Sequence, residues 1–519
     1  MIRSLWTLTL RKLALRANPN RELLLAALLL GIIGLAAHVP LANAARSFNT
    51  GIVDADSFEH GHEQAFSRTA ASGAKFIKNN LYWAYVLQNP EAADKPGTDV
   101  QPFDATDPAS PYYSNWGPFD RLVRKADAHG LEVIFTVVNT PKWARVGACK
   151  NEVACTPKPA DYADFAKAAA SRYSGSFDPG DGNGVLPRVR FWQSWVEPNL
   201  YLFYKPIFKA NGSPSSPYTY RVLLNSFYDA VHSVHNDNFV IGGGLAPNAV
   251  AGKAIAPLAF TRMALCMTGN FRNPKPRGGC TYKVKADAWA VHPYTTGAPT
   301  HFPSKPDNIS VAALPRMAKL LRAANNSNRL ISKSGKTQLW VTEFSWDSKP
   351  PDPGGLPARL QTRWVAQAMY MMYKSGVQMM SWFGLRDQAR SAGQKWSETF
   401  ESGLYLRGNT IASDRAKPVL KAFRFPFYSQ LAGRRGFSFW GRTPNNQTAT
   451  IDLFARRGSR GGFSRVGTVK ANANGIFTGV IRRSGFTARG SVYAKVRGGQ
   501  TSLAFGLWKT KDFYQPPFG

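Results

Sequence analysis

Two glutamates, Glu197 and Glu343, each follow a short run rich in aromatic and β-branched residues. Glu197 lies in "FWQSWVEPNL" and Glu343 lies in "TQLWVTEFSW". Two carboxylates that face one cleft can cleave a glycosidic bond, because one protonates the leaving oxygen while the other attacks the anomeric carbon. A separation of about 5–5.5 Å gives retention of configuration, whereas about 6.5–9.5 Å leaves room for a water molecule and gives inversion.

Strand-like and helix-like patterns alternate about eight times along the chain after residue 47. The strand-like segments are 47–58, 75–86, 131–144, 188–200, 238–247, 286–296, 337–346 and 377–387. The helix-like segments are 63–74, 117–130, 161–174, 218–235, 257–266, 311–326, 358–376 and 417–427. This alternation predicts parallel βαβ units and an α/β fold, a (β/α)8 TIM barrel over 45–427.

A doubly wound open sheet is the rival architecture for the same alternation. Its dinucleotide-binding form carries a GxGxxG turn after the first strand, and the "GGG" at 242–244 is too short to count as one. In a TIM barrel the active site lies at the carboxyl ends of the strands, where Glu197 and Glu343 are expected.

The residues from 428 to 519 have a different texture, with short alternating runs and glycine-rich turns. They predict a small all-β, sandwich-like accessory domain. This segment holds fifteen Lys and Arg against only Asp452 and Asp512. We expect it to bind an anionic cell-surface polymer, with a basic packing domain as the alternative.

The N-terminus has the features of a signal peptide over 1–44. Five basic residues precede an apolar run at 23–37, and the small residues "ANA" follow at 42–44. The apolar run is short for a span, which needs about 20 residues. The prediction is a secreted, extracellular protein with no transmembrane span after cleavage. Association with the cell surface is a further option within this prediction. A retained N-terminal anchor is the alternative.

Charge and cysteine usage agree with export. The formal net charge is +33, but a secreted protein rarely meets nucleic acid, so nucleic acid is not an expected partner. The four cysteines suggest two loop disulfides, Cys149 with Cys155 and Cys266 with Cys280, although spacing alone does not fix the connectivity. The spacings are unlike those of zinc ligands.

Five motifs in chain order, "NTPKWA", "WVEPN", "HPY", "WVTEFSW" and "SWFGLRD", resemble clan A of the glycoside hydrolases. The chain is most similar to the cellulase-like and β-xylosidase/iduronidase-like branches, and the resemblance covers 47–427. It implies a retaining hydrolase of a poly- or oligosaccharide that needs no cofactor, with Glu197 as the acid/base and Glu343 as the nucleophile.

The resemblance also implies a set of substrate-binding residues. Tyr294 would hydrogen-bond the nucleophile, and Trp382 would form the floor under the sugar. The remaining expected members of the cleft are Lys78, Trp83, Trp143, Asn199, His292 and Trp346. For each aromatic residue, packing in the barrel core is the alternative role.

Two positions depart from the clan pattern. Val196 replaces an asparagine that contacts the sugar 2-hydroxyl, and Lys78 stands where an arginine is usual. Three outcomes follow: Asn80 or Asn199 makes the contact, the substrate lacks an ordinary 2-hydroxyl, or the protein is a weakened or inactive carbohydrate-binding protein. A basic, surface-attached structural protein is a third class.

The sequence "EHGHE" at 59–63 groups two glutamates with two histidines. Adjacent ligands in one loop are more typical of a polar cleft mouth than of a metal site, so no metal is expected.

Overall fold

The structure is a computed structural model that describes residues 44–98, 101–433 and 436–518. These residues belong to one compact unit. The predicted signal peptide lies almost wholly outside the described residues. No helix within the described ranges is long and apolar enough to cross a membrane.

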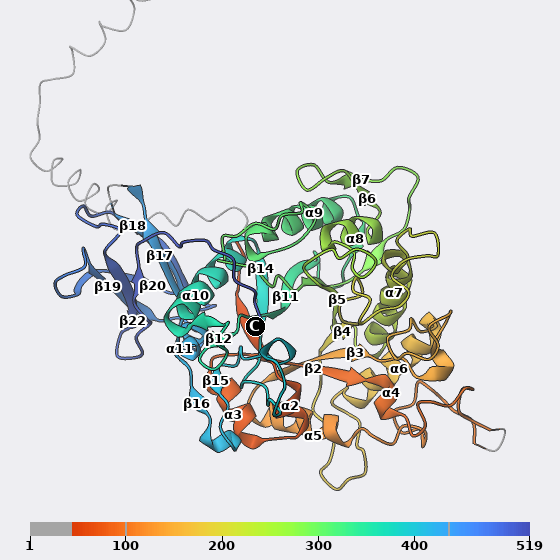
Figure 1. Ribbon diagram of the computed structural model, residues 1–519. Helices are drawn as coiled ribbons and strands as arrows, with labels where there is room; N and C mark the ends of the chain where they lie inside the picture. The colour runs from red at the N-terminus through yellow and green to blue at the C-terminus, as the bar shows by residue number, and fades with distance from the viewer. Residues whose placement is uncertain (1–43, 99–100, 434–435, 519) are drawn as a thin grey trace, which may run out of the picture. The chain divides into compact units, whose positions relative to one another are not determined.

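Eight parallel strands close into a barrel, which confirms the predicted fold class (Figure 1). Their order around the barrel is β1-β14-β11-β9-β5-β4-β3-β2. Their bounds are β1 Asn49–Val53, β2 Phe76–Tyr82, β3 Glu132–Val138, β4 Phe191–Ser194, β5 Phe239–Leu245, β9 Ala288–Val291, β11 Gln338–Phe344 and β14 Val377–Phe383. Because all eight are parallel, their carboxyl ends share one rim.

Helices follow the strands and cover the barrel. The longer ones are α3 Glu63–Ala71, α5 Gly117–Ala128, α6 Pro159–Arg172, α7 Ser216–Val234, α8 Pro257–Ala264, α9 Leu314–Asn326, α10 Ala358–Lys374 and α11 Pro418–Arg424. Two short helices, α2 Ala55–Glu59 and α4 Trp83–Val86, lie at the rim directly after β1 and β2. Apolar residues at helical spacing give each long helix one face that packs on the strands.

Large side chains fill the inside of the barrel. The cluster comprises Phe76, Ile134, Phe191, Phe239, Ile241, Ala288, Ala290, Trp340 and Met379, all buried. Phe239 stacks on Trp340 with ring centroids 4.9 Å apart. Such filling by bulky side chains is the norm in TIM barrels and makes the rim the place for a site.

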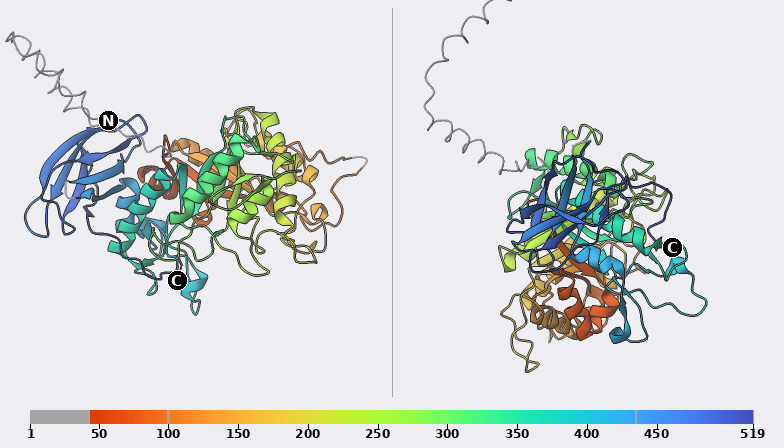
Figure 2. Two further views of the ribbon diagram at one scale, coloured as in Figure 1. Left: turned by 90° about the horizontal axis from the view of Figure 1, so that it is seen from above. Right: turned by 90° about the vertical axis from the view of Figure 1, so that its left-hand side faces the viewer.

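The chain after the barrel forms two antiparallel sheets, seen beside α10 and α11 in Figure 2. One contains β17 Phe427–Leu431, β18 Phe437–Arg442 and β21 Ile476–Ile481. The other contains β19 Thr450–Arg456, β20 Ser464–Lys470, β22 Ser491–Val496 and β23 Phe505–Gly506. The predicted all-β texture of this region is confirmed.

Short strand pairs and two disulfides order the loops. The pairs are β6 Met267–Thr268 with β7 Lys275–Pro276, β8 Val284–Lys285 with β10 Leu330–Ile331, β12 Ser348–Lys349 with β13 Leu356–Pro357, and β15 Tyr405–Leu406 with β16 Arg415–Ala416. The disulfides join Cys149 to Cys155 and Cys266 to Cys280, the pairing expected from the sequence.

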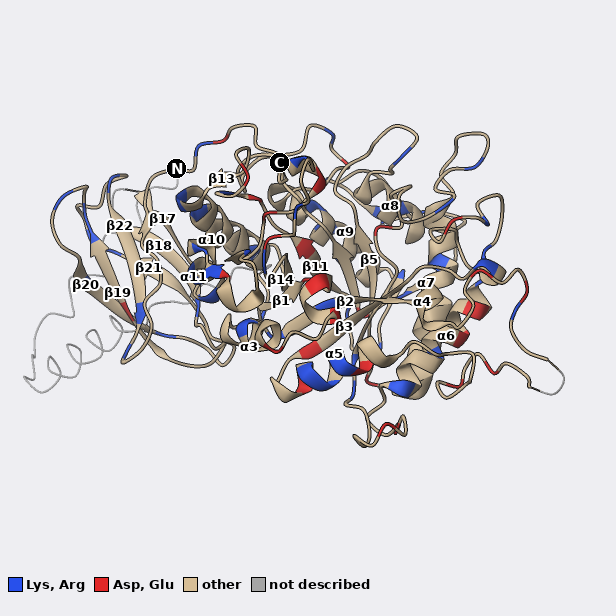
Figure 3. Ribbon diagram, turned by 60° about the horizontal axis from the view of Figure 1, so that its bottom comes forward, with Lys and Arg blue, Asp and Glu red and all other residues tan. Residues whose placement is uncertain are grey.

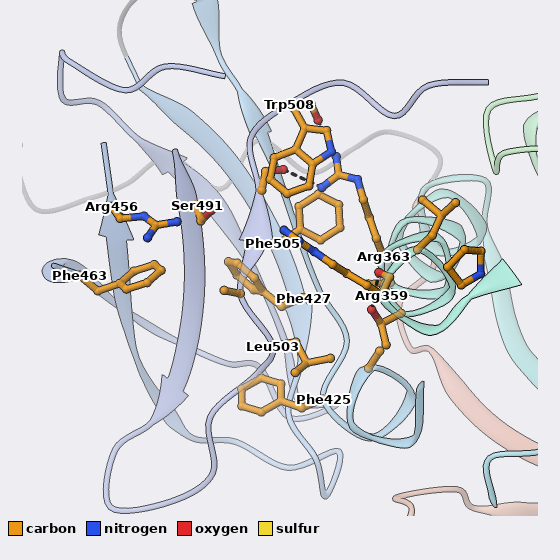
Figure 4. A pocket seen from close by; sticks show the side chains of 17 residues that line it. Arg359, Arg363, Phe425, Phe427, Arg456, Phe463, Ser491, Leu503, Phe505 and Trp508 are labelled. Carbon is orange, nitrogen blue, oxygen red and sulfur yellow. Dashed lines mark hydrogen bonds between the residues drawn. The ribbon is translucent and has the colours of Figure 1, made fainter. Parts of the chain in front are cut away.

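A pocket of about 570 Å³ lies between α10 and the antiparallel sheets (Figure 4). Arg363 of α10 lies across it, with its guanidinium carbon 4.2 Å from the ring centroid of Phe505 and 4.4 Å from that of Trp508. It also donates hydrogen bonds to the carbonyls of Gly506 and Trp508, 2.8 and 2.5 Å long. These contacts fasten the sheets to the barrel helix, and neither glutamate of interest lines the pocket.

Candidate active site

Glu197 and Glu343 meet at the carboxyl-end rim of the barrel. Glu343 belongs to β11, and Glu197 follows β4 by three residues. One oxygen of each carboxylate lies within 4.8 Å of the other. Their side chains are only 10% and 13% exposed, so the two groups interact in a poorly solvated environment.

The backbone that presents Glu197 has an unusual conformation. Trp195 has φ 65° and Glu197 has φ 43°, both in the left-handed region that non-glycine residues seldom adopt. The backbone N–H of Glu197 donates to the carbonyl of Gly244, and the amide of Gln193 donates to the carbonyl of Trp195. Strain of this kind persists where the surroundings hold it, and it gathers at functional sites.

Gly244 also has a packing reason to be glycine. A Cβ there would lie 2.7 Å from the side-chain nitrogen of Gln193 and 3.5 Å from Nε2 of His292. Its φ is 61°, which adds a conformational reason. The "GGG" at 242–244 therefore gives β5 a close approach to the site.

Glu343 is surrounded by groups that favour its ionised form. Nζ of Lys78, on β2, donates to it over 2.8 Å, and the hydroxyl of Tyr294 donates over 3.3 Å. Burial alone would raise the pKa of Glu343, but His292 and Lys78 together with these hydrogen bonds lower it. The hydrogen bond expected between Tyr294 and Glu343 is present.

Glu197 has the opposite tendency. Burial raises the pKa of its carboxyl, and the nearby charge of Glu343 adds to this rise. Nδ1 of His292 lies 2.8 Å from Oε1 of Glu197 and opposes the rise only in part. A carboxylic acid beside a carboxylate is the division of roles that acid-assisted displacement requires.

His292 links the two glutamates and is held in turn by β11. Its Nδ1 is 3.6 Å from Oε2 of Glu343, and its Nε2 is 3.1 Å from the hydroxyl of Thr342. The pairing of β11 with β14 shifts register between Val341 and Phe344, which re-aims the side chains there. His292, which was expected in the cleft, therefore lies between the two carboxylates.

Asn199 does not reach the cleft, which corrects the prediction that it binds substrate. Its amide donates to the carbonyls of Ala246 and Ile255, and its oxygen accepts from the N–H of Ala246. The side chain is fully buried. All its strong hydrogen-bonding groups serve the loop backbone, so its role is structural.

Asn80, unlike Asn199, lies on the Glu343 side of the site. It belongs to β2 and lines a cavity of about 230 Å³ together with Lys78 and Glu343. Val196 is 9% exposed and packs in the hydrophobic core. Of the two asparagines considered for the missing sugar contact, Asn80 is the one that faces open space.

The four predicted tryptophans are more deeply buried than sugar platforms need to be. Trp346 and Trp382 have no exposed surface, and their indole N–H groups donate to the carbonyls of Thr295 and Ser402. Trp83 and Trp143 pack edge to face with centroids 5.6 Å apart. None of the four rings lines the cavity beside Glu343, which favours the alternative role of packing in the core over direct contact with a sugar.

Two groups of side chains within the described residues have a spacing compatible with a metal ion. The first is Glu197 with His292 and Glu343, whose hydrogen bonds are described above. The second comprises Asp347, Asp352 and Glu401, all buried at the neighbouring loops. Oδ2 of Asp352 and Oε2 of Glu401 accept no hydrogen bond. The histidines and glutamates of "EHGHE" do not form such a group.

Sequence reasoning missed Gln193, Gly244 and Thr342, which shape the site without chemistry of their own. It also missed Phe518, whose ring lies 4.8 Å from that of Tyr294. The register shift between β11 and β14 leaves no local signal in the sequence. The same holds for the contact of Phe518 with Tyr294, which lies more than two hundred residues away in the chain.

No family model matches the sequence, and no curated protein matches it either. Solved structures do resemble it. A family 39 glycoside hydrolase from Bacteroides cellulosilyticus WH2 is 15% identical, with a TM-score of 0.47 over 86% of this chain and 80% of that one. A monomeric beta-xylosidase from Caulobacter crescentus CB15 is 14% identical, with a TM-score of 0.46 over 87% and 96%. A GH30 endoxylanase from Clostridium papyrosolvens C71 is 11% identical, with a TM-score of 0.41 over 89% and 97%.

Likenesses at these identities concern the fold alone. The function proposed below rests on the geometry of the site.

Proposed function

We propose that this protein is a retaining glycoside hydrolase in which Glu343 is the nucleophile and Glu197 the acid/base. The observation that supports this is the pair of buried carboxylates whose oxygens approach within 4.8 Å and whose pKa values move in opposite directions. An oxygen pair within 4.8 Å is compatible with the separation of about 5–5.5 Å between carboxyl groups that a retaining mechanism uses.

The first half of the reaction uses both glutamates. Glu343 attacks the anomeric carbon, and the glycosidic bond breaks as Glu197 donates its proton to the leaving oxygen. The product is a glycosyl ester on Glu343. Lys78 and Tyr294 keep the Glu343 carboxylate ionised and fix its direction of attack before the bond forms.

The second half reverses these roles. Glu197, now ionised, removes a proton from water, which attacks the anomeric carbon and releases Glu343. His292 lies 2.8 Å from Glu197 and lowers the pKa of its carboxyl, which favours the ionised form that this step needs. The net reaction adds one water across the glycosidic bond and leaves the enzyme unchanged.

A mechanism-based probe tests the proposal directly. A panel of cyclophellitol-type epoxides and 2-fluoro glycosides, with different sugar configurations, is incubated with the full chain and analysed by peptide mass spectrometry. We expect a covalent adduct on Glu343 that is absent from the Glu343→Gln variant. Absence of any adduct across the panel, with no hydrolysis of natural oligosaccharides, would contradict the proposal.

A non-catalytic carbohydrate-binding protein is the second candidate, favoured by the buried Val196. Under that reading Glu197→Gln leaves glycan affinity unchanged and the wild-type protein shows no turnover. Measuring both quantities on the same preparation separates the two functions.

We further propose that the substrate is an extracellular poly- or oligosaccharide. The two disulfides are compatible with export, and N-terminal sequencing of the protein recovered from the medium tests cleavage near residue 44.

The basic sheets provide a proposed means of retention on anionic polymers. Figure 3 shows Lys and Arg spread over these strands and loops, and Arg482, Arg483 and Arg489 are exposed. Replacing all three by Gln should weaken co-sedimentation with polygalacturonate at low salt while turnover of soluble substrates stays unchanged. Equal sedimentation of both forms would refute this role.

A further inference from the structure

The segment from 512 to 518, here called the C-terminal strap, lies along the rim that carries the two glutamates. The carbonyl of Gln515 accepts a hydrogen bond of 2.7 Å from Gly297, and that of Pro517 accepts one of 2.7 Å from Asp347. The side-chain amide of Gln515 donates to the carbonyl of Gly354 over 2.7 Å. Figure 1 shows this end of the chain beside β11 and β12.

Two further contacts fix the start of the strap. The carboxylate of Asp512 accepts from the N–H of Ala298 over 3.2 Å and lies 2.6 Å from Nδ1 of His301. The ring of Phe513 lies 5.3 Å from that of Trp364. Two adjacent prolines also limit the conformations of the segment. Its course over the rim is therefore determined by several independent contacts.

Phe518 is the strap residue that comes nearest to the chemistry. Its ring centroid lies 4.8 Å from that of Tyr294 and 4.7 Å from that of Phe400, with Phe383 at 6.5 Å. Tyr294 is hydrogen-bonded to Glu343, so one side chain separates Phe518 from the proposed nucleophile.

The order of the strands shows what the strap crosses. In the barrel β11 lies between β9 and β14. Phe518 contacts Tyr294, which follows β9, and Phe383, which ends β14. The strap is also bonded to Asp347, just beyond β11. It therefore passes over the end of the strand that carries Glu343.

The cavity beside Glu343 is aromatic on the same side. Phe383 and Phe400 line it, and Phe518 packs edge to face against both from outside the lining. The same lining includes polar and charged side chains such as Asp54, Asn80 and Lys78. A ring with an apolar C–H face and a polar edge, as in a pyranose, matches this mixed lining.

We propose that Phe518 is a positioning residue that holds Phe383 and Phe400 as the aromatic wall of the subsite for the sugar ring attacked by Glu343, so that the C-terminal strap shapes the substrate-binding site. This inference rests on the proposed function for the identity of the ligand. Its ligand class is a pyranoside that turns an apolar face toward these two rings.

Equilibrium binding tests the wall without requiring turnover. In the full chain carrying Glu343→Gln, affinity for β-linked gluco-, xylo- and manno-oligosaccharides is measured by calorimetry with and without Phe518→Ala. We expect Phe518→Ala to weaken binding of the preferred oligosaccharide about three- to tenfold, the range of one aromatic contact. Phe518→Tyr should restore most of the affinity.

Tyr514→Ala is the matched control, because Tyr514 is a strap aromatic that is 78% exposed. It should leave affinity unchanged, and thermal melts of all variants should agree within a few degrees. Unchanged or tighter binding by Phe518→Ala would overturn the inference, the latter by showing that the strap obstructs the site. If oligosaccharides bind but no probe labels the protein, the proposed hydrolysis is contradicted. The affinities of the Phe518 variants then decide the role of Phe518 alone.

Discussion

Glu343 and Glu197 are buried to a similar extent on one rim, yet their surroundings differ in charge. Glu343 lies against the ammonium group of Lys78 and the hydroxyl of Tyr294, whereas Glu197 lies against His292 and follows the apolar Val196. Burial pushes the pKa of both carboxyls upward, and for Glu343 this rise is reversed by the charges of His292 and Lys78 together with the hydrogen bonds from Lys78 and Tyr294. The comparison shows that the pKa values of two chemically identical groups move apart because of the side chains that β2 and the segment after β9 bring to them.

Removing the nucleophile should have the largest effect. Glu343→Gln keeps the shape but cannot form the glycosyl ester, so we expect kcat for an aryl glycoside to fall by at least about 10⁴-fold. Near-UV circular dichroism checks that the aromatic side chains, Tyr294 among them, still pack as in the wild type. Retention of a hundredth of the activity by a folded variant would show that another group carries the covalent step.

Removing the proton donor should have a smaller and leaving-group-dependent effect. Glu197→Gln should cost about 10²- to 10⁴-fold in kcat on a natural oligosaccharide, because general acid catalysis supplies a factor of this size. The loss in the first step should be much less for a dinitrophenyl glycoside, whose leaving group needs no proton. Equal losses on both substrates would contradict the assignment of Glu197 as the acid and Glu343 as the nucleophile.

Lys78 tests the electrostatic half of the comparison. Its charge lowers the pKa of Glu343, so this carboxyl stays ionised to a lower pH. The ionised form prevails above that pKa and is lost as the pH falls through it. In Lys78→Met the pKa should rise, and the acid limb of the kcat/KM profile should move about one to three pH units higher.

Lys78→Arg is the control for this variant, since it retains the charge and changes only the geometry. Its acid limb should stay near that of the wild type. If Lys78→Met and wild type share one acid limb, that limb does not report on Glu343.

The barrel was accessible from the sequence because its signals are local. Each strand-like run is rich in β-branched and aromatic residues, and the helix-like runs repeat apolar residues at the spacing of a helix face. Glu197 and Glu343 were identified for the same reason, because a glutamate that ends a parallel strand reaches the rim whatever the rest of the chain does.

The details of the site were not accessible because they depend on packing between distant segments. Whether Trp382 is exposed depends on the loops above it, and the burial of Asn199 depends on two carbonyls some fifty residues away. Phe518 reaches Tyr294 only because the antiparallel sheets return the chain to the rim. No periodicity in the sequence encodes such returns.

The two asparagines give the smallest expected effects and the sharpest contrast between the two sides of the site. Asn80→Ala should lower kcat/KM about tenfold, because one hydrogen bond to the sugar is worth about 1 kcal/mol or slightly more. Its melting temperature should not change, since its side chain makes one weak contact of 3.4 Å with Tyr82.

Asn199→Ala should show the reverse pattern. It leaves the N–H and carbonyl of Ala246 and the carbonyl of Ile255 without partners, at a cost of about 1–3 kcal/mol for each buried group left unsatisfied. The melting temperature should fall by several degrees, whereas kcat/KM measured well below it should change little. The opposite result would be a loss of stability in Asn80→Ala and a loss of activity in Asn199→Ala. It would exchange the roles of the two asparagines and place the sugar contact on the Glu197 side, beside Val196.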